Sequence, residues 1–68
     1  MNNLTKIIDE KGLKRTWIAR KTGILPQNIC AYEKDRLKIT QDVAIAFADV
    51  LNVTVEEIIG DEGKSISN

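Results

Sequence analysis

The sequence predicts an all-α fold, a single compact domain made of five short helices. Apolar residues recur at spacings of three and four, which gathers them on one face of a helix. Glycines and helix-capping residues separate these stretches, and alternating strand-like patterns are weak. A chain of 68 residues is long enough for one small hydrophobic core and no more.

Each of the first two helices is predicted from an apolar face and a glycine that ends it. The first spans about residues 4–11, with Asn2 or Asn3 as its cap. The second spans about residues 15–22 and ends at Gly23. Glycine suits that place because it readily takes the left-handed conformation that ends a helix.

The third helix is expected to begin at Pro26 and to run to about residue 34. Proline suits the first helical position, since its φ is preset and its missing N–H is not needed there. Ile29 and Tyr32 are three residues apart and therefore face the core together.

The fourth and fifth helices have the clearest start signals. Thr40 is the expected cap of the fourth helix, whose apolar stripe runs to Leu51. The sequence TVEE at 54–57 is a capping box, in which the Thr and Glu side chains bond each other's backbone N–H groups. The domain is therefore expected to cover residues 1–60, with residues 61–68 as a flexible tail.

The formal net charge is zero, but this total hides two unlike halves. Residues 1–40 hold nine Lys and Arg against four Asp and Glu, a net charge of +5. Residues 41–68 hold one against six, a net charge of −5. Such polarity indicates a molecule with one face suited to a polyanion and another that repels it. Chance imbalance in a short chain is the alternative reading.

The composition argues against several classes of function. No histidine and one cysteine, Cys30, leave no internal disulfide and no conventional zinc site. The acidic pairs at 9–10 and 56–57 splay apart on a helix, so no catalytic carboxylate pair is expected and the protein is predicted not to be an enzyme. No apolar run could cross a membrane and no signal peptide is evident, so a cytoplasmic protein without metal or cofactor is expected.

The second and third helices are joined by a tight connection, about residues 22–25, that contains a glycine. Two helices joined in this way form a helix-turn-helix. The surrounding residues stand in a familiar order: IA at 18–19, GI at 23–24, Ile29, YE at 32–33 and LNV at 51–53. With this order and spacing, the sequence from about Leu4 to Ile59 resembles the Cro and phage-repressor (XRE-type) helix-turn-helix domains of bacteria and their phages.

This resemblance implies a lambda repressor-like fold whose third helix, about residues 26–34, lies in the major groove of double-stranded DNA. It implies base reading by Gln27, Asn28 and Ala31. The two amides are side chains that pair with adenine, and the Ala31 methyl suits a thymine methyl or a close backbone approach.

The resemblance also implies contacts to the DNA backbone from four cations that bracket the third helix. These residues are Arg15, Lys34, Arg36 and Lys38. Their clustering beside the expected reading helix favours phosphate contact, although an ordinary solvated face is the alternative.

The expected function is that of a small transcriptional regulator, a repressor of phage, mobile-element or host origin, acting in a bacterial cell. One domain reads a single half-site, so a homodimer on a palindromic operator is expected, with no small-molecule effector evident. Candidates for the dimer interface are apolar residues that the core does not clearly need: Ile45, Val50, Val55, Ile59 and Ile66. Val55 and Ile59 could instead complete the core.

A second class of function remains open, in which the same fold acts mainly through protein–protein contacts, as an antirepressor or an antitoxin subunit. Pro26, Cys30 and Ala31 are chemically poor readers of bases, which keeps this alternative in view. Cys30 is expected to be a small helix residue rather than a redox switch.

The sequence departs from the family pattern at a few positions. Ile8 stands where many relatives carry an arginine that pairs with the glutamate matching Glu33, so Glu33 is expected to need another partner or water. Trp17 occupies a usually polar position and is expected to pack over Ile8. Lys14 and Leu25 stand where capping side chains are usual, so other contacts must hold those helix starts.

Overall fold

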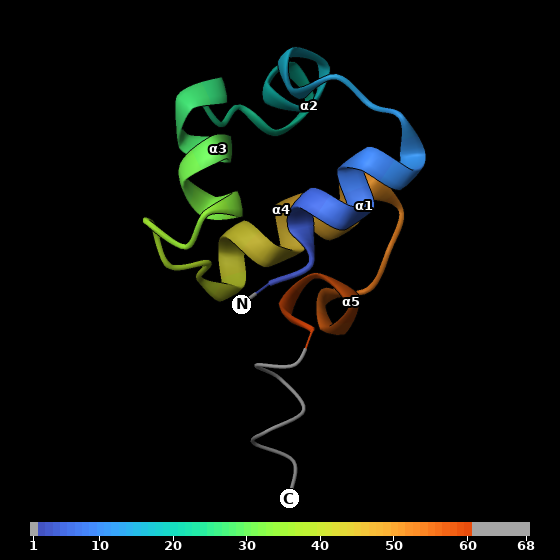
Figure 1. Ribbon diagram of the computed structural model, residues 1–68, viewed down its shortest axis with the longest axis vertical. Helices are drawn as coiled ribbons and strands as arrows, with labels where there is room; N and C mark the ends of the chain where they lie inside the picture. The colour runs from blue at the N-terminus through green and yellow to red at the C-terminus, as the bar shows by residue number, and fades with distance from the viewer. Residues whose placement is uncertain (1, 61–68) are drawn as a thin grey trace, which may run out of the picture.

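A computed structural model describes residues 2–60 of the chain (Figure 1). The bounds of its five helices are α1 Leu4–Lys11, α2 Arg15–Thr22, α3 Pro26–Glu33, α4 Gln41–Leu51 and α5 Val55–Ile59. The described part contains no strand. The all-α, five-helix prediction is therefore confirmed, and the predicted tail lies outside the described residues.

The helix ends follow the local signals of the sequence. The Thr40 hydroxyl accepts a hydrogen bond from the Val43 N–H at 3.3 Å and caps α4. In the capping box of α5, the Glu57 N–H donates to Thr54 Oγ1 at 3.1 Å and the Thr54 N–H donates to Glu57 Oε2 at 2.7 Å. At the end of α2, Gly23 has a left-handed φ of 78°, where a side chain would be strained.

The start of α1 is bonded by the side chain of Asn2, one of the two residues expected to cap it. Asn3 is the N-cap residue, but its side chain makes no capping hydrogen bond. Asn2 instead accepts a hydrogen bond through Oδ1 from the Leu4 N–H at 2.9 Å. Both asparagine amides also reach residues far along the chain, which no local pattern could indicate.

The core draws on all five helices, because each is too short to bury its apolar face alone. Its buried members are Leu4, Ile7, Ile8, Ile18, Ile29, Phe47, Ala48, Leu51 and Ile58. Tyr32 is half-buried against this core and meets Phe47 edge-to-face, with ring centroids 6.0 Å apart and an interplanar angle of 79°. The predicted inward face of α3, Ile29 with Tyr32, is thus confirmed.

The helices separate the molecule into two ends. The helix-turn-helix of α2 and α3 lies at one end and α5 at the other (Figure 1). Between them, α4 contacts both α2 and α5, while α1 contacts α3 and α5. Because α4 and α1 join the two ends, the helix-turn-helix rests on a continuous support.

Trp17 is half-buried and packs against the core cluster that contains Ile8. The Nζ atom of Lys21 lies 5.7 Å from the centroid of the Trp17 ring, which is a cation–π arrangement. Trp17, at a position that the family pattern usually makes polar, thus packs against the apolar core. The specific packing of Trp17 over Ile8 stays a prediction.

Candidate nucleic-acid interface

The turn between α2 and α3 is held by hydrogen bonds from a single threonine. Thr22 Oγ1 donates to the Ile18 carbonyl at 2.8 Å and accepts from the Ile24 N–H at 3.1 Å. Leu25 then takes an extended conformation and Pro26 begins α3. A fixed turn gives α3 a fixed angle to α2, which a rigid recognition element requires.

The outward face of α3 follows from its inward face. Successive residues turn by about 100° around an α-helix, so with Ile29 and Tyr32 inward, Gln27, Ala31 and Lys34 share the opposite side. Gln27 and Lys34 are exposed and Ala31 is half-buried.

Two other residues border this outward stripe. Asn28 is half-buried at one edge, and Cys30 is exposed at the other. The stripe is therefore short, and Ala31 and the bordering Cys30 are its small side chains. It places one amide at the centre of the face and the second amide at the border.

The starts of α2 and α3 carry no capping side chain. Lys14 and Leu25 are the N-cap residues, and neither side chain makes a capping hydrogen bond. For α3 the preset φ of Pro26 compensates. The first turn of α2 keeps backbone N–H groups without a side-chain cap, and such helix starts attract anions.

An ion pair joins the start of α2 to the end of α3. Arg15 Nε donates to Glu33 Oε2 at 2.7 Å and Arg15 Nη2 donates to Glu33 Oε1 at 2.6 Å. The Thr5 hydroxyl of α1 donates to Glu33 Oε1 at 2.8 Å. The carboxylate side chain is only 5% exposed, whereas that of Arg15 is 35% exposed. Glu33 thus has the substitute partner that the sequence required, and the contact ties three helices together.

The charges of this pair shift both groups toward their ionised forms. Burial raises the pKa of Glu33, but hydrogen bonds from Arg15 and Thr5 and the nearby positive charges outweigh it, so the pKa lies below its ordinary value. Hydrogen bonding to Glu33 raises the pKa of Arg15 further above its already high value. Asp9 lies 3.8 Å from the same guanidinium. Both members of the pair are therefore charged at neutral pH.

The segment after α3, residues 34–38, forms a compact turn that we call the basic loop. The N–H groups of Arg36 and Leu37 donate to the Ala31 carbonyl at 2.9 and 3.3 Å. Asp35 has a left-handed φ of 59°, which Asp tolerates better than most residues. Lys34, Arg36 and Lys38 are exposed, so three of the four expected phosphate-binding cations lie together at the end of α3.

Within residues 2–60, the fourth cation, Arg15, differs from the other three because it forms an ion pair. Its guanidinium is engaged by Glu33, although it remains partly exposed. Sequence reasoning assigned it by position alone and missed the ion pair. The only sequence sign of this pair was an unpartnered glutamate at 33, which could have prompted a search for a cation on a neighbouring helix.

The expected dimer residues differ in their exposure. Ile45 is 51% exposed on α4, while Val50 and Val55 are half-buried against the core. Ile59 is half-buried on α5. Ile66 lies outside the described residues.

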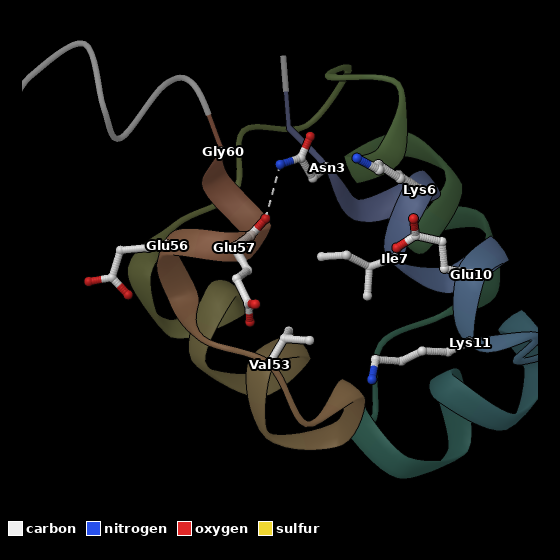
Figure 2. A pocket seen from close by; sticks show the side chains of 9 residues that line it. All are labelled: Asn3, Lys6, Ile7, Glu10, Lys11, Val53, Glu56, Glu57 and Gly60. Carbon is white, nitrogen blue, oxygen red and sulfur yellow. Dashed lines mark hydrogen bonds between the residues drawn. The ribbon is translucent and has the colours of Figure 1, made fainter.

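A shallow groove between α1 and α5 is the largest hollow among the described pockets, with a volume of about 580 Å³ (Figure 2). Figure 2 shows Lys6 and Lys11 on its α1 side and Glu56 on its α5 side. Ile7 and Val53 form its apolar part. Charges of both signs around an open apolar floor do not form a catalytic arrangement.

Residues 2–60 hold no group of three His, Cys, Asp or Glu side chains that could bind a metal ion. Their helices include none with the length and apolar character needed to cross a membrane. The outward side of α3 and the exposed cations of the basic loop lie on consecutive segments of the chain.

The comparisons agree with this geometry. The model of the Cro/C1-type HTH DNA-binding domain family matches residues 3–64, nearly the whole chain, so the protein belongs to this family and is a DNA-binding helix-turn-helix domain. No individual curated protein matches the sequence.

Proposed function

We propose that this Cro/C1-type domain binds double-stranded DNA sequence-specifically as a small transcriptional repressor in a bacterial or phage system, with α3 in the major groove. The observation that carries the proposal is the joint exposure of the α3 stripe and the basic loop on consecutive elements. A helix with polar and small side chains fits the major groove, and cations at its end meet the flanking phosphates.

In this arrangement Gln27, Asn28 and Ala31 read base edges. The exposed Gln27 amide pairs with adenine N6 and N7, and Ala31 contacts a thymine methyl. Asn28, at the border of the stripe, reaches a base or the sugar next to it. With few polar readers, each half-site supplies modest specificity, which supports binding as a homodimer to a palindrome.

Phosphates are contacted by Lys34, Arg36 and Lys38 of the basic loop, together with the uncapped start of α2. Arg15 contributes through the guanidinium edge that its contact with Glu33 leaves exposed. The apolar residues Ile45, Val50, Val55, Ile59 and Ile66 remain the candidates for the dimer interface. Ile45 is the most exposed of those described.

The test is selection of binding sites from a random double-stranded DNA library, followed by affinity measurements at two salt concentrations. We expect a palindromic site and a binding constant that falls steeply with salt. Failure to enrich any sequence, together with salt-independent binding, would reject the proposal and favour a module that acts through protein partners.

Two substitutions separate base reading from phosphate binding. Gln27→Ala is expected to cost about 1–3 kcal/mol of discrimination at one base pair while salt-sensitive binding remains. Arg36→Ala is expected to weaken binding to all sequences and to reduce the salt slope by about 0.9. The matched control is Lys6→Ala, which removes a cation from the groove between α1 and α5 and is expected to leave both quantities unchanged. Equal behaviour of Arg36→Ala and Lys6→Ala would contradict the proposed orientation.

A further inference from the structure

Asn2 makes an unusual set of contacts for a residue at the start of a chain. Its Oδ1 accepts from the Leu4 N–H at 2.9 Å, and its Nδ2 donates to the Tyr32 carbonyl at 2.8 Å and to Asp35 Oδ1 at 2.9 Å. The orientation of the amide is determined by these partners, because a flipped amide would set its oxygen against two acceptors. One half-buried side chain therefore links the start of α1 to residues 30 and 33 positions away.

Both distant partners are at the point where α3 ends and the basic loop begins. Tyr32 is the last residue but one of α3, and a carbonyl there lacks a partner within the helix. The same carbonyl accepts from the Asp35 N–H at 3.2 Å. Asp35 holds the left-handed conformation on which the turn depends, a conformation that Asp adopts more readily than most residues. Asn2 thus bonds to the backbone that sets the loop and to the residue that makes its left-handed turn.

The contact also engages one oxygen of the Asp35 carboxylate. Asp35 stands between Lys34 and Arg36, yet within residues 2–60 no ion pair joins it to either of them or to Lys38. Its Oδ1 instead accepts from Asn2. Without that donor the carboxylate would be free to pair with a neighbouring cation, and a paired cation contributes less to phosphate binding.

We propose that Asn2 is a positioning residue for DNA binding, which holds the basic loop in its turn and engages one oxygen of the Asp35 carboxylate in a hydrogen bond that competes with pairing to the loop cations. This inference rests on the proposed function, in which the loop cations contact phosphates. In this role Asn2 acts through the positions of Lys34, Arg36 and Lys38.

The test compares Asn2→Ala with Asn3→Ala. Asn3 is the matched control, because it is the same residue type one position later and its amide donates at 3.2 Å to the Glu57 carbonyl of α5, away from the loop (Figure 2). For Asn2→Ala we expect about tenfold weaker DNA binding and a salt slope lowered by about 0.9 or more, since at least one phosphate contact is lost. For Asn3→Ala we expect an affinity within about twofold of the parent and an unchanged salt slope.

Two readouts separate positioning from a general loss of stability. Amide hydrogen exchange at Arg36 and Leu37, whose N–H groups bond to Ala31, should accelerate in Asn2→Ala and not in Asn3→Ala. Asn2→Asp keeps the oxygen that faces the Leu4 N–H but sets a second carboxylate against Asp35, so it should weaken binding more than Asn2→Ala does. An unchanged salt slope and unchanged exchange in Asn2→Ala would overturn the inference.

A double-mutant cycle with Arg36→Ala shows which proposal fails if one does. If Asn2 acts through the loop, Asn2→Ala should weaken binding less in the Arg36→Ala background than in the parent, because one of the three loop cations is already gone. Full additivity would overturn the positioning role. If Arg36→Ala alone leaves DNA binding unchanged, the proposed loop–phosphate contact is itself wrong. If Arg36→Ala weakens binding and Asn2→Ala does not, only the role of Asn2 is wrong.

Discussion

Replacement of Arg15 by methionine tests the ion pair that ties α2 to α3. Arg15→Met keeps most of the apolar stem and removes both hydrogen bonds to Glu33, at 2.6 and 2.7 Å. It leaves a carboxylate that is only 5% exposed, with Thr5 as its remaining hydrogen-bond donor among those described. The variant should therefore lose stability because a buried charge loses its counter-ion.

The size of the loss follows from the burial of the two partners. Breaking a fully buried pair from one side costs about 3–5 kcal/mol. The Arg15 side chain is 35% exposed, so solvent already screens part of its attraction to Glu33. The expected loss of stability therefore lies below the range for a fully buried pair. We expect a loss of about 2–3 kcal/mol at pH 7, which for a domain of this size corresponds to a decrease in Tm of roughly 10–20 °C.

The loss of stability in Arg15→Met should depend on pH in a defined direction. In the parent protein the pKa of Glu33 is depressed, so the pair contributes stability above the unfolded pKa of about 4.3, and this is lost as pH falls through the folded pKa. In Arg15→Met, the main remaining contact that lowers the pKa of Glu33 is the hydrogen bond from Thr5. Burial should then raise the pKa of Glu33, so the folded variant should lose stability as the pH rises toward 7. The difference in unfolding free energy should thus be largest near neutral pH and shrink near pH 3.

The assay is urea denaturation between pH 3 and pH 7, followed by far-UV circular dichroism and by the fluorescence of Trp17, the single tryptophan. The control is Arg20→Met, a change at an exposed arginine of the same helix, which should stay within about 0.5 kcal/mol of the parent. If Arg15→Met loses no more unfolding free energy than the control, or loses the same amount at pH 3 and pH 7, the ion pair with Glu33 does not stabilise the fold as described.

Two further changes test the packing and the helix ends. Trp17→Glu should lower the unfolding free energy by about 2–4 kcal/mol, because it removes a half-buried ring from the core edge and its contact with Lys21. Trp17→Phe should lose less, and an unchanged melting temperature for Trp17→Glu would contradict the packing. Asn52→Ala should cost about 1 kcal/mol in thermal unfolding, because Asn52 ends α4 at a left-handed φ of 59°, whereas Asn52→Gly should be close to neutral. Equal melting temperatures for these two variants would show that the conformation costs nothing.

Much of the fold could be predicted from local patterns. The spacing of apolar residues set the five helices, and their starts at Leu4, Arg15 and Pro26 agree with the structure. Capping chemistry is equally local, so Thr40 and the capping box at 54–57 were predicted correctly. The outward position of Gln27 followed from the same periodicity, whereas the family followed from the resemblance of the ordered motifs and is shown by the family model.

The helices and the helix-turn-helix could be predicted from the sequence because each depends on residues a few positions apart. The polarity of charge is a count along the chain, and the family resemblance rests on motifs in order along the chain, so neither needs a tertiary structure. The ion pair between Arg15 and Glu33 and the hydrogen bonds from Asn2 to Tyr32 and Asp35 are visible only in the tertiary structure. These partners lie 18 to 33 positions apart in the chain. Their meeting depends on the angles at which α1, α2 and α3 pack, which core shape sets and no local spacing encodes.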